Sequence, residues 1–409
     1  QYVYALLLCF AFAFCRAHQS YAQQEATVFT FAYNLYQDGR YDLAITEFDK
    51  FMRDFPQSLK LSDVLFYKGN AQQKLGQYDD AIYTLERVLS QYPNSLMVDD
   101  ALYALGDAYL QKGALQDAAN TLNRLTSQYL DSPYLLPGIA LTGDILAKQG
   151  ESASAIQSYM YVLDQTTDAN QRESLLLRLG NAYRQSGQHA KAIETYQNAM
   201  EEFPKGARKT EIQLELAQTY FQMENYLKAN KMFEAIYKSE AKSTFGADAL
   251  YWFGMSYLRL GEFGKAKEVF NEVSKRYPGT EQQTRALLGM GLTDYYGGNY
   301  GAAVTQFSQL LQQISDPQLT KEVMFHLIWS YYRNGDLREA ARLAATLEPD
   351  DPDVISAQER VQEAESLFLA RDYSEALARL TQFAKDFPKH QLSDKIAYRM
   401  GECYLELNE

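Results

Sequence analysis

A spacing of 37 residues runs through almost the whole chain. Stepping by 37 in both directions from Gly261 reaches nine anchor positions, of which eight hold glycine and one holds glutamate. Alanine stands five residues after every anchor, and a large apolar or aromatic residue stands nine after every anchor but the last. Seven residues before the anchor, the residue is small in eight of the nine repeats. A fixed period of this length is typical of tandem repeat architectures.

The anchors divide the chain into repeats. They are Gly39, Gly76, Gly113, Gly150, Gly187, Glu224, Gly261, Gly298 and Gly335. A tenth repeat, shorter by one residue, is anchored at Arg371, and an incomplete eleventh contains Gly401. We therefore expect one repeat domain over residues 23–409.

Each repeat is predicted to contain two helices joined by a tight turn. In the seventh repeat the apolar spacing is helical over residues 246–260, here named helix A, and again over residues 264–276, here named helix B. Gly261 between them can adopt the left-handed conformation that ends a helix. Gly254 on helix A and Ala266 on helix B are small, so the two helices can approach closely.

Cap signals indicate where a new helix A begins. Thr280 with Gln283 fits a capping box. Ser132-Pro133 fits a cap residue followed by proline at the first helical position. One helix pair cannot bury its apolar face alone, whereas stacked pairs share a continuous core. The sequence therefore predicts an all-α solenoid of about ten tandem helix pairs.

The repeated residues resemble the signature of the tetratricopeptide repeat family. In the seventh repeat they are Gly254, Tyr257, Gly261, Ala266, Phe270 and Pro278. The resemblance covers roughly residues 26–409, and it implies a right-handed superhelix of helix-turn-helix repeats that binds proteins. The period exceeds the family's usual 34 residues by three, and the extra residues fall in joints such as FPQSLKLSD and YPNSLMVDD. These joints resemble those of bacterial envelope members, which include an outer-membrane assembly lipoprotein and a periplasmic coordinator associated with the Tol-Pal system.

The first 22 residues are predicted to form a secretory signal peptide. Residues 3–15 are an apolar run that is shorter than the ~20 residues needed to span a bilayer. Ser20-Tyr21-Ala22 supplies the small residues that a signal peptidase requires. The expected location is therefore the bacterial periplasm. One alternative is a lipid-carrying Cys15, although Phe14 before it is large. Another is a buried N-terminal helix, although the run lacks an amphipathic period.

Charge argues against a nucleic-acid partner. The net charge is −13, and such a surface repels phosphate backbones. The stretch GEFGK at residues 261–265 suggests a phosphate loop, but Arg259 and Ala266 stand where that loop needs glycine and Ser or Thr. A GxxG clamp for RNA would need a basic setting, which this chain does not provide.

The motif content also argues against catalysis and metal binding. The histidines His189, His326 and His390 fall in different repeats, and each is expected to be a surface or packed side chain. No Cys or His spacing suggests zinc, and Cys403 is expected to be a small apolar residue on a helix. We expect neither an enzyme nor a cofactor or metal site.

A partner-binding groove is expected along the A helices, which line the concave face in the family that the repeats resemble. The groove positions are those one, four and five residues after the small residue of helix A. They are polar in early repeats, as at Asn70, Gln73 and Lys74, and become aromatic later. Including Tyr251 and Phe325 one turn earlier, the expected binding residues are Phe221, Tyr251, Met255, Leu258, Arg259, Tyr295, Tyr296, Phe325, Trp329, Tyr332 and Arg333.

Aromatic residues and arginine are the types enriched at binding hot spots. We therefore predict that residues 214–335 hold the main groove and that Trp329 contributes most. The alternative is that these side chains pack between neighbouring A helices.

These patterns predict a non-catalytic scaffold of the periplasm or cell envelope that binds a protein or peptide, in outer-membrane or envelope biogenesis. Association with the outer membrane or peptidoglycan is a further expectation. One alternative function is a peptidoglycan- or carbohydrate-binding module whose aromatic rings stack on sugars. Another is a regulatory repeat array attached to a domain beyond residue 409.

Overall fold

The structure is all-helical and consists of tandem helix pairs, as the 37-residue period predicts. The computed structural model describes residues 21–344, 372–387 and 393–407, together with residues 346, 360, 361, 364, 367 and 368. No strand occurs in these residues. The anchor Arg371, His390 and residues 1–20 of the predicted signal peptide lie outside the described residues.

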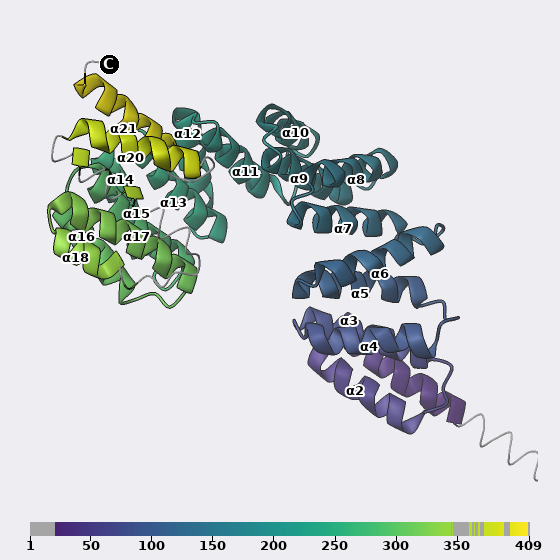
Figure 1. Ribbon diagram of the computed structural model, residues 1–409. Helices are drawn as coiled ribbons and strands as arrows, with labels where there is room; N and C mark the ends of the chain where they lie inside the picture. Colours follow the sequence, from purple (N-terminus) through teal and green to yellow (C-terminus); the bar gives the residue numbers. More distant parts are fainter. Residues whose placement is uncertain are drawn as a thin grey trace, which may run out of the picture. The chain divides into compact units, whose positions relative to one another are not determined.

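The helices fall into two compact units, Gln1–Val269 and Phe270–Glu409. Odd-numbered helices are A helices and even-numbered helices are B helices (Figure 1). After a helix over residues 21–37, the first unit contains α2 (Tyr41–Asp54), α3 (Leu61–Lys74), α4 (Tyr78–Gln91), α5 (Val98–Lys112), α6 (Leu115–Gln128), α7 (Leu135–Lys148), α8 (Ser152–Gln165), α9 (Ala169–Gln185), α10 (His189–Glu202), α11 (Lys209–Gln222), α12 (Tyr226–Glu240) and α13 (Thr244–Arg259). The boundary lies inside α14 (Phe263–Arg276). The second unit contains α15 (Glu281–Tyr296), α16 (Tyr300–Leu311), α17 (Pro317–Asn334), α18 (Leu337–Ala344), α20 (Tyr373–Asp386) and α21 (Ser393–Glu406).

The predicted helices of the seventh repeat are confirmed as α13 and α14, within two residues at each end. The Thr280 half of the predicted capping box is present, because its hydroxyl accepts a 3.3 Å hydrogen bond from the backbone N–H of Gln283. The Gln283 side chain reaches back one residue further than the capping box requires, and accepts from the N–H of Gly279 at 2.7 Å. The prediction for Pro133 is wrong, since α7 begins only at Leu135.

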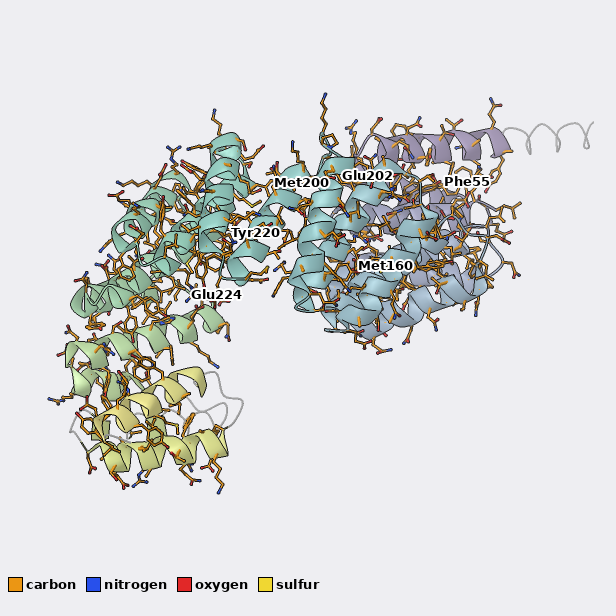
Figure 2. The ribbon with its side chains drawn as sticks, turned by 90° about the horizontal axis from the view of Figure 1, so that it is seen from above. Phe55, Met160, Met200, Glu202, Tyr220 and Glu224 are labelled. Carbon is orange, nitrogen blue, oxygen red and sulfur yellow. The ribbon has the colours of Figure 1, made fainter. Side chains whose placement is uncertain are left out.

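The turn between the helices of each repeat has one backbone conformation throughout. All eight anchor glycines have positive φ, as at Gly187 (75°) and Gly261 (76°). Glu224 holds the same turn between α11 and α12 with a φ of 60°, and it is the one non-glycine residue with positive φ in the described part of the chain (Figure 2). This conformation is strained for any residue that has a Cβ, so Glu224 lowers the stability of its repeat relative to glycine.

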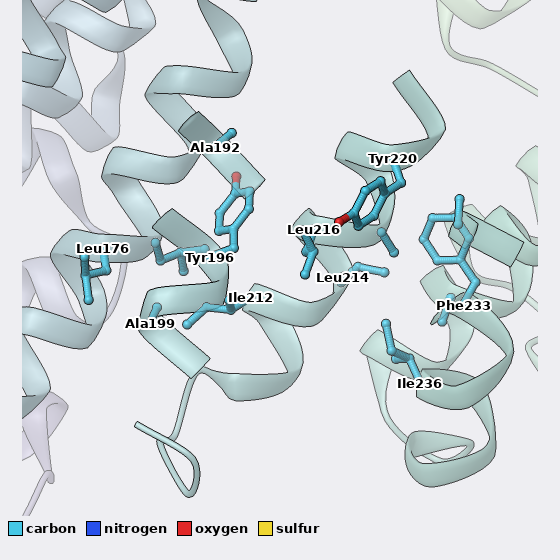
Figure 3. Packing of buried hydrophobic residues seen from close by; sticks show 14 residues of the cluster. Leu176, Ala192, Tyr196, Ala199, Ile212, Leu214, Leu216, Tyr220, Phe233 and Ile236 are labelled. Atoms are coloured by element: carbon cyan, nitrogen blue, oxygen red, sulfur yellow. The ribbon is translucent and has the colours of Figure 1, made fainter. Parts of the chain in front are cut away.

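The core of each helix pair depends on a small residue of helix A that lies against a large side chain of helix B. A Cβ added to Gly180 would lie 2.3 Å from Tyr196, and one added to Gly291 would lie 2.3 Å from Phe307. The alanines five residues after the nine anchors are all at most 1% exposed. Figure 3 shows one such core, which includes Leu176 of α9, Tyr196 of α10 and Phe233 of α12. The repeated small and large positions are therefore the core.

Between neighbouring repeats, helix A of the later repeat packs against helix B of the earlier one and also contacts the earlier helix A. In the first unit, α3, α5, α7, α9 and α11 each contact the next odd-numbered helix, and in the second unit α15 contacts α17. The layer of A helices is thus the tighter one, as on the inner side of a curved array. Side chains on this layer can meet across neighbouring repeats.

The joints that lengthen the period carry hydrogen bonds back to the preceding repeat. The Ser132 hydroxyl donates to the Asp99 carboxylate at 2.6 Å and accepts from the N–H of Tyr134 at 3.1 Å. The Ser58 hydroxyl likewise donates to Glu25 at 2.5 Å. These serines shape the joint instead of capping the first turn, which explains why α7 starts after Pro133.

Replacing Glu224 by glycine is expected to stabilise the chain by about 1 kcal/mol, because glycine adopts positive φ without the Cβ strain. Thermal unfolding should then shift upward by about 2 °C. The reverse change in the next repeat, Gly261→Glu, should destabilise, since backbone strain is the main cost where no atom lies within 4 Å of the added Cβ. Equal unfolding temperatures for wild type and Glu224→Gly would show that the positive φ of Glu224 costs no stability.

The change Gly180→Ala should lower the free energy of unfolding by about 1–3 kcal/mol, because the new methyl group overlaps Tyr196. The matched control is Gly264→Ala on α14, where an added Cβ meets nothing within 4 Å. That variant should be neutral or slightly more stable, since alanine favours a helix. Urea unfolding measures both. Equal midpoints for the two variants would show that the contact with Tyr196 does not restrict the size of the residue at position 180.

Candidate partner-binding site

Six of the predicted binding residues lie in the second unit on two A helices that contact each other. Tyr295 and Tyr296 end α15, while Phe325, Trp329, Tyr332 and Arg333 are on α17. The spacing of 325, 329 and 332 or 333 places those four side chains along one face of α17. B helix α16 packs against both α15 and α17.

A pocket of about 440 Å³ lies between these helices. Its lining residues are Tyr295, Tyr296, Tyr300, Phe325, His326, Trp329 and Arg333. Five of the seven are residues that the groove positions predicted, and Tyr332 adjoins the pocket through its ring contact with Trp329 at 5.6 Å. The structure thus brings this part of the predicted set together.

Edge-to-face ring contacts hold the aromatic walls. The centroid of Tyr295 lies 5.3 Å from that of Tyr296 and 5.6 Å from that of Tyr300. Across the pocket, the rings of Phe325 and Trp329 lie 6.2 Å apart. This geometry is favourable for aromatic pairs, so the walls are held in place without a ligand. Tyr296 at the rim is 55% exposed.

Tyr300 and His326 line the pocket but were not predicted as binding residues. Tyr300 begins helix B two residues after its anchor, where Tyr41, Tyr78 and Tyr226 stand in other repeats. That recurrence is a signal that could have found it. No comparable signal marks His326, which is expected from the sequence to be a surface or packed side chain.

Arg333 is held against Tyr300. Its Nη2 donates to the Tyr300 hydroxyl at 2.7 Å, and its guanidinium lies 5.0 Å from the centre of the same ring. Within the described part of the chain, Arg333 forms no ion pair with a carboxylate. The side chain is exposed, so its remaining donors face solvent at the pocket.

His326 is a neutral member of the pocket lining. Its ring stacks on Phe307, with centroids 5.7 Å apart and planes 22° apart. Burial lowers the pKa of His326 to about 4, so the imidazole carries no charge at neutral pH. Arg333 is therefore the one charged side chain among the described residues that line the pocket.

The predicted residues of the first unit have a different environment. Phe221 packs against the buried cluster of Figure 3, with its ring 5.1 Å from that of Trp252. Leu258 is only 6% exposed and belongs to the buried hydrophobic core. Tyr251 and Met255 are half-buried, and Arg259 is exposed. For Phe221 and Leu258, packing between helices is the role that the structure shows.

Polar groove positions of the middle repeats are paired with side chains of the next A helix. Asp144 accepts a hydrogen bond from the Tyr159 hydroxyl at 2.7 Å and pairs with Arg178 at 2.9 Å. Arg184 pairs with Glu215 of the next A helix at 2.7 Å. Burial raises the pKa of both carboxyl groups, and the arginines oppose this shift. These side chains join neighbouring repeats, and few of their hydrogen-bond donors and acceptors are left for a ligand.

A second aromatic cluster spans the first two repeats, where no binding residue was predicted. The ring of Tyr67 lies 4.9 Å from that of Tyr33 and 5.3 Å from that of Tyr36. Burial raises the pKa of Tyr67 to about 12. Applying the groove positions to Ala32 would have selected Tyr33 and Tyr36, so the signal was present in the sequence.

The described residues contain no group of three His, Cys, Asp or Glu side chains that could hold a metal ion. None of their helices is both long enough and apolar enough to cross a membrane. His189 is half-buried at the start of α10, and Cys403 is buried in a cluster with Ala376 and Leu380, as expected for an apolar helix residue.

Comparisons with known proteins agree with the repeat pattern. Four family models, each described as tetratricopeptide repeat, match residues 29–94 and 288–354, 72–137, 171–239, and 248–280. Together they cover more than half of the chain. No curated protein matches it.

Solved structures of repeat proteins are also similar to parts of the chain. A tetratricopeptide repeat protein from Parabacteroides merdae is 17% identical with a TM-score of 0.52, and the match covers 66% of this chain and 99% of that one. The C-terminal part of a TPR repeat-containing protein from Cytophaga hutchinsonii is 18% identical with a TM-score of 0.46, covering 64% and 99%. PilF from Pseudomonas aeruginosa is 17% identical with a TM-score of 0.42, covering 54% and 94%. At these identities, the first match supports the fold alone.

The lowered pKa of His326 predicts a loss of stability in acid. The unfolded chain binds a proton at His326 more readily than the folded chain does. The stability of the fold is therefore unaffected by this group above about pH 6.5, and it decreases as the pH falls toward 4. Between pH 7.5 and pH 5 the cost should reach up to about 2 kcal/mol.

The variant His326→Phe, which keeps a ring for stacking on Phe307, should lose less stability over that range. Urea unfolding of both proteins at both pH values gives the comparison, and the difference between them removes the contribution of carboxyl groups. An identical loss in the two proteins would exclude His326 as the cause.

Proposed function

The chain belongs to the tetratricopeptide repeat family, and on that premise we propose that it is a non-catalytic scaffold that captures a protein or peptide partner at the pocket between α15, α16 and α17. Repeats of this family generally bind protein partners. The partner contacts the A-helix face and anchors a side chain in the pocket.

The observation that carries this proposal is the aromatic pocket itself. Five aromatic rings and one arginine converge on a space of about 440 Å³, within the size range of ligand pockets. Such residues dominate binding energy at protein interfaces because they bury large areas at a low cost in side-chain entropy. A wall built from two neighbouring A helices also suits a segment that crosses several repeats.

We further propose that the scaffold acts in the bacterial periplasm or cell envelope, in outer-membrane or envelope biogenesis. The support is the apolar run of residues 3–15 with its following peptidase site, and the resemblance of the joints to those of envelope members of the family. Partners of this scaffold are then exported proteins.

A photocrosslinking amino acid placed at Tyr296 should capture a partner in cells that make the full chain, because this position lies at the pocket rim. Combining Trp329→Ala with Tyr332→Ala should reduce capture at least ~10-fold, as expected for hot-spot residues. Mass spectrometry identifies the captured protein.

The controls separate binding from folding. Trp329 also packs against the buried cluster around Leu380, so its loss is compared with Tyr300→Phe, which removes only a hydroxyl group at the pocket. Circular dichroism should stay helical in every variant. The same crosslinker at Tyr83, which is 66% exposed on α4, should capture nothing specific. Unchanged capture in the double variant, or capture of peptidoglycan fragments in place of a protein, would overturn the proposal.

A further inference from the structure

We infer that the pocket selects a partner segment in which an aromatic or large aliphatic side chain stands next to an acidic one: the apolar side chain enters the ring-lined space and the carboxylate pairs with Arg333. This inference rests on the proposed function and specifies the chemistry of the partner at that site.

The shape and lining of the pocket fit one large side chain. Its volume of about 440 Å³ is near the lower end of ligand pockets, which span roughly 300–1,000 Å³. Tyr295, Phe325 and Trp329 form its apolar walls, and the stacked His326 adds a neutral face. An apolar side chain therefore enters without leaving a charged group desolvated.

The charge at the pocket is single and positive. Arg333 has five N–H donors, and the structure uses one of them on Tyr300. The ring of Tyr300 under the guanidinium restricts the side chain, so pairing with a carboxylate costs less conformational entropy. A planar guanidinium can bind a carboxylate through two parallel hydrogen bonds.

A cationic ligand is disfavoured at the same place. Aromatic cages often bind ammonium groups, but here Arg333 already lies over the face of Tyr300 at 5.0 Å. A second cation in the pocket would be repelled by the positive charge of Arg333.

The rest of the chain sharpens this selection. Its net charge of −13 repels acidic segments in general, so an acidic segment gains by binding where a positive group is exposed. In the middle repeats, Arg178 and Arg184 are already paired with Asp144 and Glu215. Arg333 lacks such a carboxylate partner among the described residues, so it is available to pair with an acidic side chain at the pocket.

Trp329 provides a direct signal for the test. The chain has two tryptophans, and Trp252→Phe leaves Trp329 as the one that remains. In this background the full chain is titrated with blocked hexapeptides that carry Phe-Asp, Phe-Asn or Ala-Asp at their centre, while the fluorescence of Trp329 is followed. A tetramer of N-acetylglucosamine is the carbohydrate probe.

The Phe-Asp peptide should bind at least about 5-fold more tightly than the Phe-Asn peptide, and the Ala-Asp peptide should bind weakest. Arg333→Gln should remove the preference for Asp, because binding of the Phe-Asp peptide should weaken at least about 5-fold more than binding of the Phe-Asn peptide. A merely structural role of Arg333 would weaken both peptides alike. Arg333→Lys, which keeps the charge without the planar fork, should retain part of the preference.

The outcomes separate this inference from the proposed function. Equal binding of the Phe-Asp and Phe-Asn peptides, or equal loss of both in Arg333→Gln, overturns the acidic preference and leaves the pocket as a protein site. Binding of the sugar without any peptide, or no response of Trp329 to any probe, overturns both.

Discussion

The close contact between a small residue of helix A and a large side chain of helix B is the interaction on which the rest of the structure depends. Gly180 lets the ring of Tyr196 lie against the backbone of α9, and Ala192 becomes fully buried beneath it. In the ninth repeat the small position of helix A is taken by Ile328, which is buried. With each pair held tightly, neighbouring A helices can touch.

Most of the fold could be predicted because one physical requirement recurs at a fixed spacing. The turn needs positive φ at each anchor, and the core needs the small and large positions, so each repeat confirms the others. The joints were harder, since Ser132 bonds to Asp99 of the preceding repeat and local cap rules do not include such a partner. Residues that lie outside this repetition, such as the packed His326, gave no separate signal.

The candidate site was only partly predictable because one set of helix positions serves two purposes. At Asp144 and Arg184 these positions join neighbouring repeats through ion pairs. At Tyr295 and Trp329 they line a pocket instead. Residue type marked the change from polar to aromatic, but Leu258 shows that type alone does not establish exposure. Burial depends on the size of neighbouring side chains, which the spacing does not specify.

The hydrogen bonds of the joints affect how the array unfolds and how its number of repeats can change. The backbone N–H of Arg208 donates to the buried Glu173 at 2.9 Å, and Gly206 leaves room for that carboxylate. Each such bond ties a joint to the start of the preceding helix A. An internal repeat is thus fastened on both sides, whereas a terminal one is fastened on one side. Fraying should therefore proceed inward from the ends, and in-frame gene duplication can lengthen the array only by whole repeats that retain both the carboxylate and its joint.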